Sequence, residues 1–119
     1  MTKETIYRSI AFFLLAGFCE IGGGYMVWIA IKNKLPLWVG ILGAIMLVVY
    51  GVIVTLQPAG FGRTYAAYGG VFVIMALLWG WVVDKTKPDL YDVIGAAIIL
   101  VGTIVIFYAP RKVLAFPVN

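Results

Sequence analysis

The sequence predicts an all-α integral membrane protein with four transmembrane helices, and two observations lead to that fold class. First, 64% of the 119 residues are hydrophobic and only 12% are charged, with a mean hydropathy of +1.06. A soluble domain of this size cannot bury so much apolar surface. Second, apart from Glu20, the charged residues fall near the two ends of the chain or between long apolar runs. This distribution is typical of a polytopic membrane protein.

The apolar runs predict a single membrane domain over residues 1–119. A helix needs about 20 residues to cross the hydrocarbon core of a bilayer, and four runs are long enough. These runs are continuously apolar, which favours helices over the alternating strands of a membrane barrel. The predicted spans are residues 10–31, 37–56, 65–83 and 90–108.

Polar residues beside the spans predict where the helices begin. Residues 1–9 are expected to form a short polar lead before the first span. Thr64 is the expected N-cap of the third helix, because a threonine hydroxyl can accept a bond from a free N–H. Asp89 and Asp92 are three residues apart, which predicts a capping box at the start of the fourth helix.

The basic residues give almost no orientation in the membrane. Four spans place both ends of the chain on one side, where five basic residues lie, against four on the other side. The side that holds the two ends of the chain has Lys3, Arg8, Arg63, Arg111 and Lys112, and the other side has Lys32, Lys34, Lys85 and Lys87. One interpretation is a weak bias that keeps both ends in the cytoplasm. The other is dual topology, with oppositely inserted copies paired as an antiparallel homodimer. The scattered positions form no patch for nucleic acid.

Glu20 is the candidate functional residue, because it is the only charged side chain near the middle of a span. Placing a carboxyl there costs about 3 kcal/mol or more, which makes a functional role the first hypothesis. Burial penalises the charged form, so this group can hold a proton or release it and bind a cation, but not both. The alternative is a protonated glutamate that only helps helices to pack. Its neighbours on the helix are small and leave room for a ligand or a partner helix: Ala16, Gly17, Gly23 and Gly24.

Aromatic residues of the third span are candidates for a second wall of the site, since ring faces attract organic cations. Packing and membrane-interface roles are the alternative. The side chains that recur at helical spacing are Tyr65, Tyr68, Phe72, Met75 and Trp79. Other aromatic residues lie nearer the span ends and are expected at the membrane–water interface: Tyr25, Trp28, Trp38, Tyr91 and Tyr108.

Small residues at fixed spacing predict helix contacts, because they let two backbones approach closely. The pairs are Gly40 with Ala44, Ala66 with Gly70, and Gly95 with Gly102.

Enzymatic activity is not expected: the chain has no histidine, and Ser9, its only serine, is placed outside the spans. Neither a metal site nor a cofactor is expected.

Motifs spread over nearly the whole chain resemble the YnfA family of small bacterial inner-membrane proteins. They are Cys19-Glu20-Ile21 with Gly23 and Trp28, Gly62-Arg63-Thr64-Tyr65-Ala66-Ala67-Tyr68-Gly69-Gly70-Val71, Val82-Val83-Asp84, and Asp92 before Gly95-Ala96. The wider resemblance is to the small multidrug resistance transporters, which share four helices and one glutamate in the first helix.

The resemblance implies a function and an assembly. In those transporters the glutamate, matched by Glu20, binds a proton or a cationic substrate in turn. Third-helix aromatics line the site, for which Tyr65 is the nearest match and Trp79 the next. The fourth helix pairs two protomers through glycines that match Gly95 and Gly102, and antiparallel dual-topology homodimers are a feature of the group. The resemblance thus implies proton-coupled export of cations across a bacterial inner membrane.

Three hypotheses follow, all with the lipid bilayer as surroundings and none with nucleic acid as a partner. The preferred hypothesis is a homodimeric exporter of small or lipophilic cations, coupled to protons through Glu20. The second is a non-transporting membrane subunit or scaffold in which Glu20 is a helix-packing element. The third is a channel for a small ion, which would conduct without proton exchange.

Overall fold

The computed structural model describes residues 2–110, and within that range it contains four helices and no strand. The helices are α1 (Lys3–Lys32), α2 (Leu37–Val54), α3 (Phe61–Val82) and α4 (Leu90–Tyr108). Each is long and apolar enough to cross the hydrocarbon core of a bilayer. The predicted fold class of four membrane-spanning helices is therefore confirmed. Arg111 and Lys112, expected beyond the last helix, lie outside the described residues.

The first helix begins earlier than the sequence predicted. Thr2 is its N-cap, and Thr2 Oγ1 accepts a hydrogen bond from Thr5 N at 3.2 Å. The expected polar lead is therefore wrong for residues 3–9, which are helical. Ser9 is a buried residue of this helix, with only 1% of its surface exposed. The 30 residues of α1 extend over about 45 Å, so the helix is longer than a bilayer core is thick.

The third helix also begins early, and the fourth begins as predicted. Gly60 is the N-cap of α3, so the expectation that Thr64 caps this helix is wrong. Thr64 N donates to Gly60 O at 3.0 Å, and Thr64 Oγ1 donates back to Ala59 O at 3.4 Å. The hydroxyl is thus used as a donor. The capping box of α4 is confirmed: Asp92 N donates to Asp89 Oδ1 at 2.8 Å, and Asp89 N donates to Asp92 Oδ2 at 3.0 Å.

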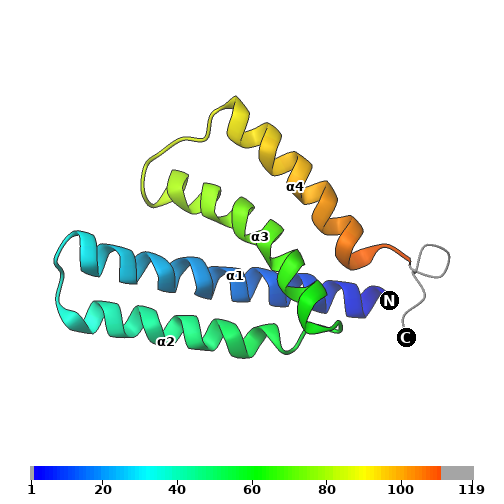
Figure 1. The fold of residues 1–119 in the computed structure, drawn as a ribbon, viewed down its shortest axis with the longest axis horizontal. Coiled ribbons are helices and arrows are strands. Elements are labelled where there is room, and N and C mark those ends of the chain that lie inside the picture. Colours follow the sequence, from blue (N-terminus) through cyan, green and yellow to red (C-terminus); the bar gives the residue numbers. More distant parts are fainter. Residues whose placement is uncertain (1, 111–119) are drawn as a thin grey trace.

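The four helices form two hairpins that meet through α1 and α3 (Figure 1). α1 and α2 lie antiparallel and side by side, whereas α3 and α4 diverge from that pair. The α1–α2 and α3–α4 connections lie at one end of the molecule, here called the loop end. The N-terminus, the α2–α3 connection and the last turn of α4 lie at the other, here called the terminal end. The start of α1 and the end of α4 are therefore on the same side, as four spans require.

Two glycines set the close approach of α1 and α2. A Cβ atom on Gly43 would lie 2.6 Å from the carbonyl oxygen of Gly23, and one on Gly23 would lie 2.7 Å from that of Gly43. Only a glycine backbone permits this spacing. The predicted contact through Gly40 is looser, since its Cβ would meet Ala30 Cβ at 3.4 Å, and Ala44 is exposed. The tightest crossing therefore lies one turn further along α2 than Gly40.

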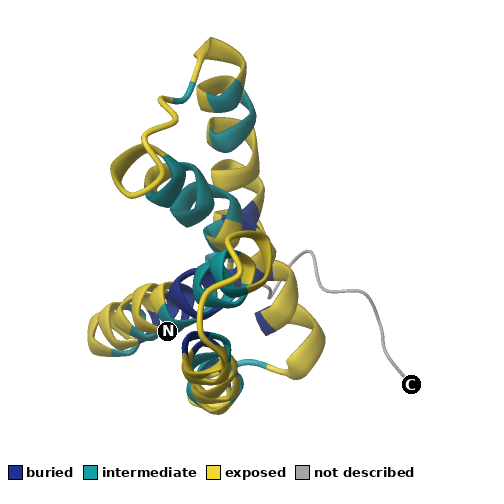
Figure 2. Ribbon diagram, turned by 90° about the vertical axis from the view of Figure 1, so that its left-hand side faces the viewer, coloured by how far each residue is buried: buried dark blue, intermediate teal, exposed yellow. Residues whose placement is uncertain are grey.

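The buried core is small and lies toward the terminal end. The ring of Phe13 packs against Tyr68 and Phe107, with centroid separations of 4.5 and 4.9 Å. Gly70, a predicted contact residue, lies against the side chain of Thr103 and so brings α4 to α3. Figure 2 shows that buried positions gather where the helices meet and that most of the remaining surface is exposed. Large apolar side chains dominate that exposed surface, as a surface facing lipid requires.

A buried network of polar side chains ties the terminal end together. Ser9 Oγ donates to Gln57 Oε1 at 2.6 Å and also pairs with the hydroxyl of Tyr108 at 2.9 Å. Gln57 Nε2 donates to the carbonyl oxygen of Ser9 at 3.0 Å. Nearby, the hydroxyl of Tyr68 donates to the carbonyl oxygen of Phe12 at 3.1 Å. These bonds join α1 to α3, to α4 and to the α2–α3 connection.

Removing the Gln57 amide is expected to destabilise the folded protein by about 1–2 kcal/mol, because Gln57→Ala breaks both bonds to Ser9 at a buried position. The measurement is the unfolding midpoint in detergent, titrated with a denaturing detergent. Thr55→Ala is the control, since Thr55 Oγ1 bonds only the nearby Val52 carbonyl in an exposed place. Equal midpoints for the two variants would show that the network adds nothing to stability.

Candidate functional site

Glu20 lines a cavity of about 480 Å³ between α1 and α3, toward the loop end. This volume lies within the range of small-molecule sites, about 300–1,000 Å³. Ten residues form the lining: Glu20, Ile21, Gly24, Tyr25 and Trp28 of α1, Phe72, Ala76, Trp79 and Gly80 of α3, and Asp84 just beyond α3. The structure thus brings the predicted residues Glu20, Gly24 and Trp79 together from two helices.

Two polar atoms of this cavity wall are buried without a hydrogen-bond partner among residues 2–110. They are Glu20 Oε2, an acceptor when ionised, and Trp79 Nε1, a donor. Buried polar groups nearly always have partners, so each exception calls for an explanation. Helix packing alone does not supply one, because the neighbouring helices offer neither atom a partner. The two residues that carry these complementary polar atoms line one cavity, which suits a ligand with both a charge and an apolar body.

Four of the ten lining residues are aromatic: Tyr25, Trp28, Phe72 and Trp79. The ring of Trp79 packs edge-on against Phe18 and Tyr25, with centroid separations of 5.7 Å for each pair. Tyr25 and Trp28, which the sequence predicts to lie at the membrane interface, both line the cavity. The relation of Trp28 to Glu20 could have been found from the sequence, because Gly24 and Trp28 follow Glu20 at intervals of four residues along one helix face.

The other two aromatic candidates, Tyr65 and Tyr68, are not among the residues that line the cavity. Tyr68 is only 2% exposed and belongs to the terminal-end core, where its hydroxyl bonds the carbonyl oxygen of Phe12. Tyr65 is 39% exposed and packs on Phe61, with ring centroids 4.3 Å apart. Neither tyrosine lines the cavity that holds Glu20. Helical spacing placed these side chains on one helix, but it did not show which turns of that helix line the cavity.

The small residues near Glu20 divide into packing residues and a lining residue. Ala16 is fully buried in the core, and a Cβ on Gly17 would collide with the sulfur of Met75. Gly23 packs against Gly43 where α1 crosses α2. Gly24 has no atom within 4 Å of the position a Cβ would take, and it lines the cavity. Of the four, only Gly24 provides open space beside the carboxylate.

The predicted dimer-contact glycines lie on the sparsely packed fourth helix. A Cβ atom on Gly95 or Gly102 would meet no atom within 4 Å. α4 packs mainly on α3, and only two of its residues, Thr103 and Phe107, are buried. Within the part of the chain that the structure describes, these glycines therefore make no close contact, and their pairing role stays a prediction.

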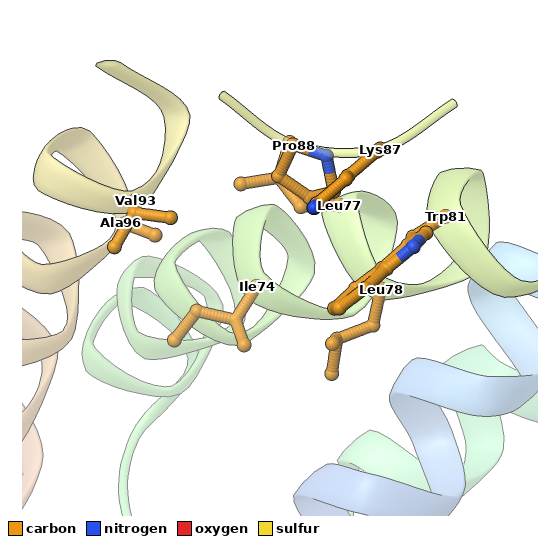
Figure 3. Close-up of a pocket in the computed structure, with 8 residues that line it drawn as sticks. All are labelled: Ile74, Leu77, Leu78, Trp81, Lys87, Pro88, Val93 and Ala96. Carbon is orange, nitrogen blue, oxygen red and sulfur yellow. The ribbon is translucent and has the colours of Figure 1, made fainter. Parts of the chain in front are cut away.

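A second cavity, of about 320 Å³, lies between α3 and α4 at the loop end (Figure 3). Its wall contains no carboxylate and consists mostly of apolar side chains: Ile74, Leu77, Leu78 and Trp81 of α3, Lys87 and Pro88 of the connection, and Val93 and Ala96 of α4. The two cavities share no lining residue.

Fold and site together define a small, multi-pass α-helical membrane protein with a carboxyl group in a cavity between two helices. More narrowly, the chain belongs to the YnfA/UPF0060 family. Residues 6–112 match the model of that family, whose description reads "Uncharacterised BCR, YnfA/UPF0060 family".

Several bacterial membrane proteins are similar to this chain over most of its length. The UPF0060 membrane protein DSY4157 of Desulfitobacterium hafniense is 61% identical over 106 residues, which cover 88% of this chain and 98% of that protein. The UPF0060 membrane protein YfjF of Bacillus subtilis is 56% identical, over 87% of this chain and 95% of its own length. The protein sll0793 of Synechocystis is 54% identical, over 89% and 98%. No solved structure matches this chain.

Proposed function

We propose that this membrane protein exports small or lipophilic cations in exchange for protons, with Glu20 binding the one or the other in turn. The observation that carries the proposal is the buried, unpartnered Oε2 atom of Glu20 in a cavity walled by aromatic rings. The protein acts as a transporter and not as an enzyme, and it works without a cofactor.

Competition at one carboxyl couples the two fluxes. An isolated carboxylate is costly in an apolar cavity, so without a cation the group keeps a proton. A cation that enters can replace the proton as the stabilising charge, while its apolar groups contact the rings of Tyr25, Phe72 and Trp79. Because proton and cation exclude each other, movement of one across the membrane drives movement of the other.

The working unit in this proposal is an antiparallel homodimer in the bacterial cell (inner) membrane. Two observations support it: the Lys and Arg counts on the two sides are nearly equal, and α4 leaves Gly95 and Gly102 uncovered for a second copy. The relatives are bacterial membrane proteins. Two oppositely oriented copies can expose their cavities to opposite sides and exchange roles.

The test is proton release from purified protein in detergent when an organic cation is added. We expect tetraphenylphosphonium or tetraethylammonium to release protons from the wild type, and no release from Glu20→Gln, which has no proton to exchange. Glu4→Gln is the matched control, because Glu4 is an exposed carboxylate on the same helix. Release is followed with a pH indicator in weakly buffered solution around neutral pH.

Each alternative predicts a different result. Equal release from the wild type and from Glu20→Gln would contradict the proposed role of Glu20. If Glu20 were a packing element, no folded variant would release protons, and Glu20→Gln would reduce cross-linking between copies in membranes. A channel would pass ions without proton exchange, and a pH gradient alone would not make it accumulate a cation.

A further inference from the structure

The cavity around Glu20 contains a second carboxylate, Asp84, which follows the last turn of α3. The backbone fixes its position: Asp84 N donates to the carbonyl oxygen of Trp79 at 3.3 Å, and Thr86 N donates to that of Gly80 at 2.8 Å. Lys85, between them, has a φ of 61° and turns the chain back over the helix end. Asp84 is therefore held at the rim of the cavity, beyond the ring of Trp79.

The two carboxylates lie at opposite ends of the cavity. α1 and α3 run in the same direction, so later residues of both helices lie nearer the loop end (Figure 1). The lining extends from Glu20 to Trp28 on α1 and from Phe72 to Asp84 along α3. Eight residues of helix, the interval from 20 to 28, cover about 12 Å. Glu20 thus marks the inner end, Asp84 the outer end, and aromatic rings occupy the wall between them.

The surroundings leave the Asp84 carboxylate available to a ligand. Lys87, three residues later, lines the separate cavity between α3 and α4 (Figure 3). No lysine or arginine in the range 2–110 forms an ion pair with Asp84. At the outer end of the wall, Lys32 Nζ lies 5.3 Å from the ring centroid of the lining residue Trp28, a cation–π contact within the chain.

We infer that Asp84 is a second cation-binding group and that the cavity prefers elongated organic dications to monocations of the same shape. One charge pairs with Glu20, the apolar middle lies along the rings, and the other charge reaches Asp84. This inference rests on the proposed role of Glu20 and adds a substrate class to it. Asp84 is exposed to solvent, so its contribution is modest and sensitive to salt.

The test compares two ligands of the same shape that differ in one charge: hexamethonium and (7,7-dimethyloctyl)trimethylammonium, in which carbon replaces one of the two nitrogens. Binding to the purified protein in detergent is measured by calorimetry and by tryptophan fluorescence. We expect the wild type to bind hexamethonium up to about fivefold more tightly, which is the effect of one exposed ion pair. Asp84→Asn should remove that preference, because it weakens binding of the dication more than binding of the monocation. Asp84→Glu should keep the preference, and added salt should reduce it.

The outcomes separate this inference from the proposed function. A dication preference that persists in Asp84→Asn, or that is missing from the wild type, would overturn the role of Asp84 and leave that of Glu20 intact. Glu20→Gln should weaken binding of both ligands. If it bound both as well as the wild type does, the proposed function itself would fail, and the inference with it.

Discussion

Vesicles that contain the Glu20→Gln variant are expected to transport no more cation under a pH gradient than vesicles without protein. Glutamine has the shape of a protonated glutamate, so helix packing around α1 should change little. The glutamine side chain can neither release a proton nor carry a negative charge, so the variant loses both proton release and cation binding at this position. The measurement is accumulation of a fluorescent lipophilic cation in vesicles of purified protein, driven by an imposed proton gradient.

Two further variants test whether this effect is specific to Glu20. Glu4→Gln removes an exposed carboxylate from the first turn of the same helix and should transport at the wild-type rate. Trp79→Phe removes the unpartnered indole N–H of the cavity but keeps an aromatic ring there, so transport should continue at a reduced rate. Proton-driven accumulation by Glu20→Gln at the rate of the wild type would rule out exchange at this carboxyl.

Substitution of Gly43 by valine is expected to have the second largest effect, a loss of about 2–3 kcal/mol of stability or failure to fold. Even the first carbon of a side chain at Gly43 would lie 2.6 Å from the carbonyl oxygen of Gly23 and 2.9 Å from Met26 Cβ. The obstacle is largely backbone, which cannot rotate away as a flexible side chain can. α1 and α2 would have to separate, and α1 carries Glu20.

Gly51→Val is the matched control, because Gly51 lies on the same helix and a Cβ there would meet no atom within 4 Å. Unfolding midpoints in detergent and the fraction of protein that elutes as a single species give the comparison. We expect Gly51→Val to behave as the wild type and Gly43→Val to be less stable or aggregated. Equal stability of the two variants would contradict a close helix crossing at Gly43.

Local patterns determined the class of this protein, its helices and its candidate residue. Hydropathy depends only on which residues follow one another, so four apolar runs sufficed to predict four spans. The capping box of Asp89 and Asp92 was also predictable, because it closes within one turn. The start of α1 was not predictable, because the side chains that bond the buried Ser9, those of Gln57 and Tyr108, are far away in the chain.

Only the tertiary structure decided which side chains share the cavity of Glu20. Tyr68 and Trp79 both lie on α3 at helical spacing, yet Tyr68 is in the core and Trp79 lines the cavity. Tyr25, Trp28 and Asp84 join the cavity because α1 and α3 are in contact near the terminal end and leave space between them toward the loop end. Helical periodicity specifies the faces of one helix. Which faces meet, and where they part, depends on contacts such as Gly23 with Gly43 between residues distant in the sequence.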